Sequence, residues 1–344
     1  MQAPPLRIVI DIRARHRRIW RVFVFALLSA LAGLFVLTLL LGQSFTPPGA
    51  ILRDLLGEDV PGVAFTVGQL RLPRAVMSIL AGLSFGLGGV AFQLMLRNPL
   101  ASPDIIGISW GASAAAVFAI VVLSLKGPVV SIFAVAAGLA VALTVYGLSF
   151  RNGVAGTRLI LVGIAVSAML ESFIAYTLSI APAWNLQEAL RWLTGSVNGA
   201  RLGDALPLLV ALTVFGGLLI VRARDLEALR LGDDMAAALG VRVGRTRVLI
   251  LIAAVGMIAA ATAVTGPIAF VAFLSGPIAR ALNHGRTTLL GAGLVGAVIV
   301  LGGDHAGAYA FADLNLPVGV VTGAFGAPFL LWLLARGRTT RRAA

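Results

Sequence analysis

Residues 71–112 read RLPRAVMSILAGLSFGLGGVAFQLMLRNPLASPDIIGISWGA, and they indicate what kind of fold the chain adopts. No charged residue lies between Arg74 and Arg97, a stretch long enough to cross the apolar core of a bilayer, about 30 Å thick, at about 1.5 Å per residue. The glycines at positions 82, 86 and 89 share a helix face with Gln93. Such small-residue faces are typical of membrane helices that pack on one another. The stretch therefore predicts one helix of a polytopic bundle.

The composition of the whole chain supports this class of fold. Hydrophobic residues make up 59% of the 344 residues and charged residues 12%, against about 25% charged in soluble domains. We therefore expect an all-α fold, with a single transmembrane domain over residues 1–344. The chain contains no cysteine, which excludes disulfides, thiol catalysis and cysteine-based metal sites.

Ten segments are apolar enough to be membrane-spanning helices, with the eighth and ninth short for full crossings. They are residues 22–41, 74–96, 107–125, 129–150, 159–180, 206–221, 248–265, 268–283, 289–303 and 318–334.

The net charge of +13 comes from arginines that follow the positive-inside rule, which explains it better than nucleic-acid binding does. With ten crossings, 21 of the 27 basic residues fall on one side of the membrane. Both the basic N-terminal segment, residues 1–21, and the basic tail, residues 335–344, are then cytoplasmic. The predicted location is the cytoplasmic membrane.

Two segments outside the membrane are long enough to carry structure of their own. Residues 42–70 predict a short helical cap on the outer side. Residues 222–247 predict a cytoplasmic loop with a short helix that begins at Asp233, continues through an alanine run and ends at Gly240. This loop is either a solvated connector or a docking element for a cytoplasmic partner, because its apolar side chains need a cover. Those side chains are Leu229, Leu231, Met235 and Leu239.

Six motifs give the chain a specific likeness, and they run in order over most of its length. They are Arg71-Leu72-Pro73-Arg74; Gln93 with residues 97–103 (RNPLASP); Gly107 with Gly111-Ala112; Leu231-Gly232 with residues 238–241 (ALGV); residues 266–271 (GPIAFV); and residues 316–322 (LPVGVVT) with Gly326-Ala327-Pro328. With them the chain resembles the permeases of ATP-binding-cassette (ABC) importers for iron-siderophores, haem and cobalamin. Residues 151–153 (RNG), 195–199 (GSVNG) and 232–234 (GDD) add a likeness to the ferric-enterobactin permeases.

The resemblance implies a type II importer fold and a subunit without catalysis of its own. Its implied partners are an ABC ATPase dimer, a second permease and an extracytoplasmic binding protein. It implies that Arg71 and Arg74 meet acidic residues of the binding protein, although anchoring to lipid headgroups would also explain them. It also implies that an ATPase contacts the loop helix through Leu231, Gly232, Asp233, Asp234, Ala237, Ala238, Leu239 and Gly240.

Some positions depart from the family pattern. Residues 275–280 (SGPIAR) lack a histidine that relatives commonly carry, and residues 283–286 (NHGR) match a second motif only loosely. Ala308 stands where some members have a third outer arginine. We therefore favour a heterodimer with a paralogous permease over a homodimer.

Four polar residues are candidates for the translocation pathway: Gln93, Glu171, Ser196 and Asn198. A carboxylate in mid-span such as Glu171 faces an aqueous cavity or bonds to a neighbouring helix. We expect no cofactor and no metal site, because His284 and His305 stand alone. The chain also lacks a phosphate-binding loop, so ATP hydrolysis belongs to a separate subunit.

Two alternatives remain open at this stage. Within the importer class, the cargo is haem or cobalamin instead of a ferric siderophore. In a different class, the chain is an ion-coupled secondary transporter with Glu171 as its proton site.

Overall fold

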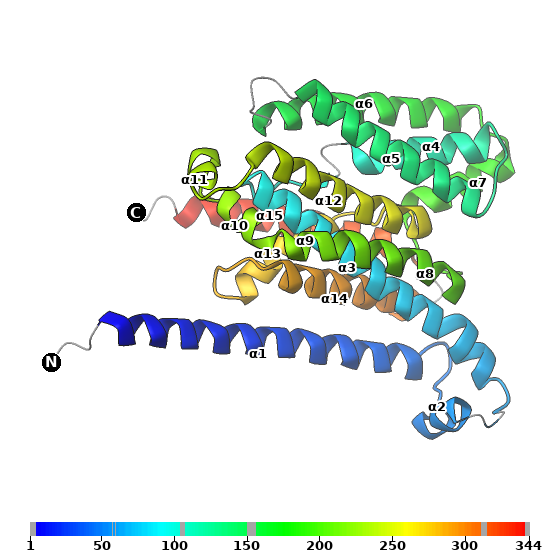
Figure 1. Ribbon diagram of the computed structural model, residues 1–344. Helices are drawn as coiled ribbons and strands as arrows, with labels where there is room; N and C mark the ends of the chain where they lie inside the picture. The colour runs from blue at the N-terminus through cyan, green and yellow to red at the C-terminus, as the bar shows by residue number, and fades with distance from the viewer. Residues whose placement is uncertain are drawn as a thin grey trace.

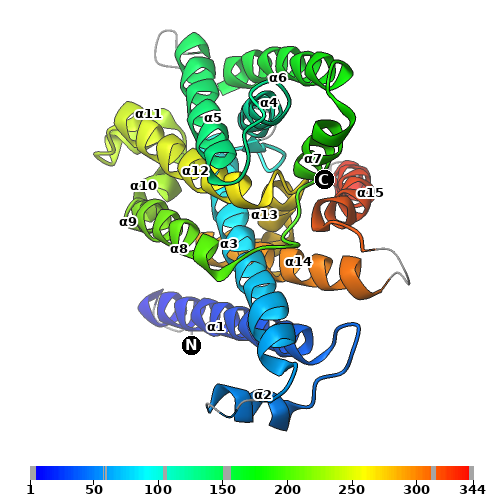
Figure 2. The same ribbon diagram turned by 90° about the vertical axis from the view of Figure 1, so that its right-hand side faces the viewer.

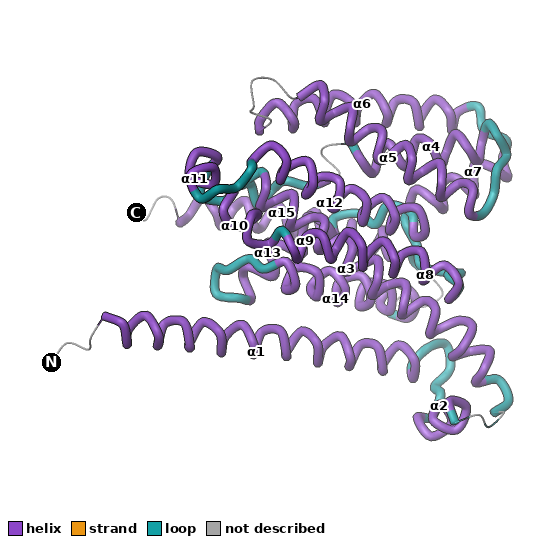
Figure 3. The backbone as a smooth tube through the Cα atoms, in the orientation of Figure 1, coloured by secondary structure: helices purple, strands orange, loops and turns teal. Residues whose placement is uncertain are grey.

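The structure is a computed structural model that describes residues 5–56, 58, 60–103, 107–149, 156–310 and 315–340. Within these residues the chain is helical, with loops between the helices and no strand (Figure 3). Two of the segments named above lie wholly or partly outside the described residues: the run 151–153, and residues 341–344 of the basic tail.

The elements begin with α1 (Pro5–Leu40), α2 (Pro48–Leu55), the π-helical segment η1 (Ala64–Arg71), α3 (Leu72–Met95), α4 (Ile108–Val121), α5 (Pro128–Ser149), α6 (Gly156–Ser179) and α7 (Ala183–Thr194). They continue with α8 (Leu202–Ala211), the π-helical η3 (Leu212–Gly216), α9 (Gly217–Val221), α10 (Ala223–Leu229), α11 (Asp233–Ala238), α12 (Val243–Thr265), α13 (Val271–Leu282), α14 (Leu289–Tyr309) and α15 (Val318–Thr340). Helix α2 is the short helix predicted within residues 42–70.

Each of the ten predicted ranges falls on a helix or, for residues 206–221, on the run α8–η3–α9. Among the described residues, seven helical stretches are long and apolar enough to cross a membrane: Ile10–Leu40, Ala64–Met95, Pro128–Ser149, Arg158–Ser179, Leu202–Val221, Val243–Thr265 and Leu289–Tyr309. The other three ranges fall on shorter apolar helices, Ile108–Val121, Val271–Leu282 and Val318–Trp332. The chain is therefore a multi-pass membrane protein.

One predicted boundary is wrong for an identifiable reason. The ninth range ends at Gly303 because polar residues follow, but α14 continues to Tyr309, since Asp304 pairs with an arginine inside the bundle. Helix α1 begins at Pro5 and continues without a break through the basic segment that precedes Val22. Nothing in that segment stops a helix, because it contains no glycine and its two prolines precede the first turn's hydrogen bonds.

Helix α3 lies at the centre of the bundle, as the end-on view shows (Figure 2). It contacts α14, α12, α13 and α8. In the most apolar 18-residue window of each span, 78% of the window is buried for the span that contains α3 and 72% for α12. The buried share is only 17% for α1 and for α6. Helices α1 and α6 therefore form opposite edges of the molecule (Figure 1).

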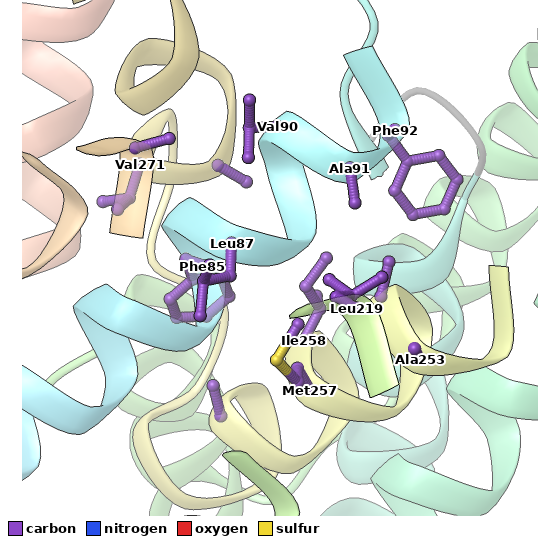
Figure 4. Close-up of a cluster of buried hydrophobic side chains, with 14 of the residues drawn as sticks. Phe85, Leu87, Val90, Ala91, Phe92, Leu219, Ala253, Met257, Ile258 and Val271 are labelled. Atoms are coloured by element: carbon purple, nitrogen blue, oxygen red, sulfur yellow. The ribbon is translucent and has the colours of Figure 1, made fainter. Parts of the chain in front are cut away.

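The glycine face predicted for α3 is confirmed by its packing. A Cβ added at Gly82 would lie 2.5 Å from the Cα of Ala297 on α14, and one at Gly86 would overlap α14 as well. One at Gly89 would overlap the carbonyl of Ala272 on α13. The remaining faces of α3 pack large side chains such as Phe92 against α9 and α12 (Figure 4). Glycine is thus required where backbones of neighbouring helices touch.

The bundle has two distinct ends, visible in Figure 1. The start of α1, the end of α15 and both α10 and α11 lie at one end, called here the α11 end. Helices α2 and α7 lie at the other, called the α7 end. The two termini of the described chain are therefore on the same side of the bundle.

Candidate functional site

Helix α11 is the central element of the candidate site, and its existence confirms the sequence prediction. It begins after Gly232, whose φ of 112° a residue with a side chain rarely adopts, and it ends before Gly240, with φ 84°. Two glycines thus set the limits of this short helix. Helix α10, directly before it, was not predicted, because its charged sequence carries no clear apolar period.

The outward face of α11 is apolar and uncovered. Leu231, Met235 and Leu239 are 65%, 53% and 61% exposed, and Ala237 and Ala238 are exposed as well. Leu229, the fourth side chain predicted to need a cover, is buried inside the chain. Large apolar side chains with small residues between them, at an end that faces water, indicate a surface that another protein covers.

Asp233 ties α11 to two other elements. Its Oδ1 accepts a hydrogen bond from Nη2 of Arg247 on α12 at 2.8 Å and lies 3.6 Å from Nη2 of Arg97, in the turn after α3. Asp234 is exposed, with no hydrogen bond among the described residues. Of the two carboxylates expected to meet a partner, Asp233 is therefore engaged within the chain. Sequence alone could not show this, because Arg97 lies far from Asp233 along the chain.

At the α7 end, Arg74 forms a buried ion pair with Asp304. Its Nε and Nη2 donate to the two carboxylate oxygens at 2.6 and 2.8 Å, and the Asp304 side chain is 1% exposed. This bidentate contact joins α3 to α14. A short paired geometry of this kind compensates for the cost of removing both charges from water.

Arg71 is buried too, and it closes the loop after α1. Its Nη1 donates to the carbonyl of Leu39 at 2.8 Å and to Thr46 Oγ1 at 3.0 Å, while Nη2 donates to the carbonyl of Ser44 at 2.7 Å. Arg71 therefore satisfies carbonyls at the end of α1 that have no partner within the helix.

Neither Arg71 nor Arg74 presents an exposed guanidinium group in this conformation. Each is less than a tenth exposed, and each already has partners within the chain. Direct contact with a binding protein would require these groups to leave their partners. The docking role itself stays a prediction.

Three glycine-containing motifs meet at the α7 end. Ser196 N donates to the carbonyl of Thr265 at 2.7 Å, and Gly319 N donates to the carbonyl of Gly195 at 3.1 Å. A Cβ at Gly195, Gly266 or Gly319 would overlap a facing backbone carbonyl. The turns 195–199, 265–268 and 317–319 therefore form one junction that holds α7, α13 and α15 together.

The four pathway candidates do not gather in one place. Ser196 belongs to the junction, and Asn198 is exposed beside it. Gln93 is buried at the other end of α3, where its Nε2 donates to the carbonyl of Phe273 at 2.9 Å and joins α3 to α13. Glu171 is exposed on α6, without a hydrogen bond or ion pair to a described residue.

Comparison of the sequence with protein-family models places the chain in a known family. Residues 30–336 match the model of the FecCD transport family. The chain belongs to the FecCD transport family. Among the described residues, no group of three or more His, Asp or Glu side chains is placed to hold a metal ion.

Individual relatives make the family more specific. The chain is 37% identical over 288 residues to the ferric enterobactin transport system permease protein FepG of Escherichia coli (strain K12), covering 83% of this chain and 86% of that protein. It is 39% identical over 319 residues to the achromobactin transport system permease protein CbrC of Dickeya dadantii (strain 3937), covering 91% and 90%. The likeness to the iron-siderophore permeases is therefore confirmed.

A solved structure shares the fold. A metal-chelate type ABC transporter in an inward-facing conformation superposes with a TM-score of 0.80 at 25% identity, covering 91% of this chain and 98% of the other. Helix α11 and the contacts described above at both ends therefore lie in a helical bundle with the fold of that ABC transporter.

Proposed function

We propose that this chain is the permease subunit of an ATP-driven ABC importer that carries a ferric siderophore across the cytoplasmic membrane. Relatives named for enterobactin and achromobactin transport support this cargo. The observation that carries the proposal is the uncovered apolar face of α11, because an ATPase that drives transport needs a surface through which to move the permease. An ion-coupled secondary transporter has no need of such a surface.

The same proposal assigns the partners. A dimer of ABC ATPases covers α11 on the cytoplasmic side, and a binding protein delivers the chelate at the α7 end. A paralogous permease forms the other half of the membrane unit. The mid-span carboxylate Glu171 supports this last assignment, because an unpaired carboxylate exposed on a membrane helix needs a partner or an aqueous cavity. Helix α6 therefore lines the pathway between the two permeases.

The proposal includes ten membrane crossings with both termini in the cytoplasm. The three shorter apolar helices then count as crossings, in tilted form or together with the loops at their ends. The distribution of basic residues supports this orientation, since a topology with ten crossings puts 21 of the 27 on the cytoplasmic side.

Transport of defined chelates tests the cargo. In a host that lacks its own siderophore permeases, the chain is expressed with its neighbouring importer genes and supplied with iron-55 bound to catecholate, hydroxamate or citrate chelators, or with labelled haem or cobalamin. We expect iron uptake from at least one ferric siderophore and none of haem or cobalamin. Uptake of haem or cobalamin alone would overturn the cargo.

Copurification tests the transport class. A tag on this chain should isolate a complex with ATPase subunits and a second, paralogous permease. Uptake that persists without any ATPase, and that follows the proton gradient, would show a secondary transporter instead.

A further inference from the structure

A basic cavity lies at the α11 end, between α1, α10 and the turn that joins α13 to α14. Its volume is about 600 Å³. The residues that give it its character are Arg13, Arg17 and Trp20 from α1, Glu227 and Arg230 from α10, and Arg286 from the turn. Four arginines therefore face one glutamate, and none of the four forms an ion pair with another described residue. This surplus of positive charge selects an anionic ligand.

The walls of the cavity are held in place by contacts outside it. Asn283 is 2% exposed, and its Nδ2 donates to the carbonyl of Arg286 at 3.1 Å, which orders the turn. Phe23, which is buried, packs against Gly291 and fixes α1 on α14. Helix α10 is anchored by Leu226 and Leu229, each 1% exposed. The three elements that carry the arginines are thus positioned before any ligand binds.

The depth of the cavity matches the headgroup layer of a bilayer. The apolar part of α1 begins at Val22, which is 62% exposed. Trp20 lies about 3 Å and Arg17 about 8 Å beyond it along the helix axis, at about 1.5 Å per residue. The headgroup layer extends about 5–8 Å beyond the apolar core on each side. Tryptophan is enriched at this level of membrane proteins.

An apolar surface adjoins the basic one. A second cavity of about 450 Å³ opens on the other flank of the same turn. Most of its lining is apolar, from Ile19, Val22, Phe23, Ala26, Leu27 and Leu282, and Arg18 and His284 complete it. The turn between α13 and α14 therefore has a basic surface on one flank and, on the other, a surface that suits acyl chains.

We propose that the basic cavity binds the phosphate headgroup of an anionic phospholipid of the inner leaflet. Basic pockets between transmembrane helices on the cytoplasmic side bind such headgroups. The lipid would hold the first helix against α10 and α14 by bridging arginines that repel one another when the cavity is empty. The proposal rests on the orientation given above, but its test reads lipid binding and not transport. Its failure is therefore distinct from failure of the transport function.

The test uses the complex isolated through a tag on this chain, with whatever subunits remain bound. Native mass spectrometry measures binding of dioleoylphosphatidylglycerol, dioleoylphosphatidylcholine and inorganic phosphate. The test variant is Arg17→Gln with Arg286→Gln. The matched control is Arg15→Gln with Arg224→Gln, which removes the same charge at the same end from exposed positions outside the cavity.

We expect the wild-type complex and the control to prefer phosphatidylglycerol to phosphatidylcholine. In the test variant its affinity should fall about fivefold for each arginine, or about 25-fold for both. The single variant Arg17→Gln should show the fivefold step, which keeps the test informative if the double variant assembles poorly. An unchanged affinity in the variant, or an equal fall in the control, would overturn the proposal. The proposal would also be overturned if inorganic phosphate, at the same concentration as the lipid, displaced phosphatidylglycerol. It would equally be overturned if the test variant lost its ATPase subunits but still bound phosphatidylglycerol as the wild type does.

Discussion

Individual side chains at the two ends of this bundle join helices that are distant in sequence. At the α7 end, Arg74 holds Asp304 in a buried bidentate pair. At the α11 end, Asp233 accepts a hydrogen bond from Arg247 and forms a longer ion pair with Arg97. All three side chains are partly exposed. The two links differ in energy, since breaking a buried pair costs about 3–5 kcal/mol and an exposed pair contributes at most about 1 kcal/mol.

Removing one partner of the buried pair should destabilise the protein. We expect Arg74→Gln to lower the melting temperature and the amount in the membrane, because Asp304 would stay buried without its partner. Asp304→Asn combined with Arg74→Gln should recover much of the loss, and Arg53→Gln, which breaks an exposed pair at 4.0 Å, should have little effect. Thermal melting of the purified protein measures this. A stable Arg74→Gln protein that fails only in uptake would instead favour the docking role.

Asp233 and Asp234 should differ although they are neighbours. Asp233→Ala releases α11 from α12 and from the turn after α3, so ATP hydrolysis should respond less to the loaded binding protein while stability changes little. Asp234→Ala removes the same charge from an exposed position and serves as the control. Hydrolysis in reconstituted vesicles gives the comparison. If both variants respond like the wild type, the link does not transmit motion.

At the scale of elements, glycines decide how closely helices approach. Helix α3 meets α14 at Gly82 and Gly86 and meets α13 at Gly89, with backbone against backbone. Helix α11 has the opposite character, since Ala237 and Ala238 face outward and have no cover. Similar residue types therefore serve packing inside the bundle and, as we propose, docking at its end.

A side chain at Gly89 should prevent the bundle from closing. A Cβ there would overlap the Ala272 carbonyl, so even Gly89→Ala must push α13 away from α3. Overpacked cores are typically destabilised by about 1–3 kcal/mol. We therefore expect a marked fall in the abundance of the variant in the membrane. Gly68→Ala, where nothing lies within 4 Å, is the control. Quantitative blotting of membrane fractions decides, and equal abundance of both variants would contradict the packing argument.

Bulky residues on α11 should block the ATPase without disturbing the fold. Ala237→Trp and Ala238→Trp add volume to an exposed face, so insertion and melting temperature should stay as in the wild type. Assembly with the ATPase should weaken, or hydrolysis should lose its response to the binding protein. Ala14→Trp, at an exposed position of the same end, controls for added bulk. Wild-type assembly, hydrolysis and uptake in both variants would mean that α11 is only a connector.

At the scale of the whole molecule, the ends of the bundle carry different charge and the edges remain apolar. The end with α10 and α11 holds the basic cavity, and the opposite end buries Arg71 and Arg74 in the chain. Exposed apolar side chains on α6, such as Leu161, Met169 and Tyr176, contact lipid or another subunit. The charge asymmetry supports the α11 end as the cytoplasmic one.

The absence of cysteine allows a direct test of this orientation. Ala237→Cys and Asn198→Cys each place a thiol at an exposed position on opposite ends. In intact spheroplasts a membrane-impermeant maleimide should label the Asn198→Cys variant at once. It should label the Ala237→Cys variant only after the membrane is opened. The reverse pattern would invert the topology.

The apolar helices and the close packing of α3 could be predicted from the sequence, because apolar length and glycine spacing act locally along one helix. So could the family and the limits of α11. The tertiary structure alone revealed the partners of Arg71, Arg74 and Asp233, since a charge at a helix end looks alike whether it faces water or an acid 230 residues away. It also decided that the basic start of α1 forms one wall of a cavity, because the other walls come from α10 and from the turn after α13.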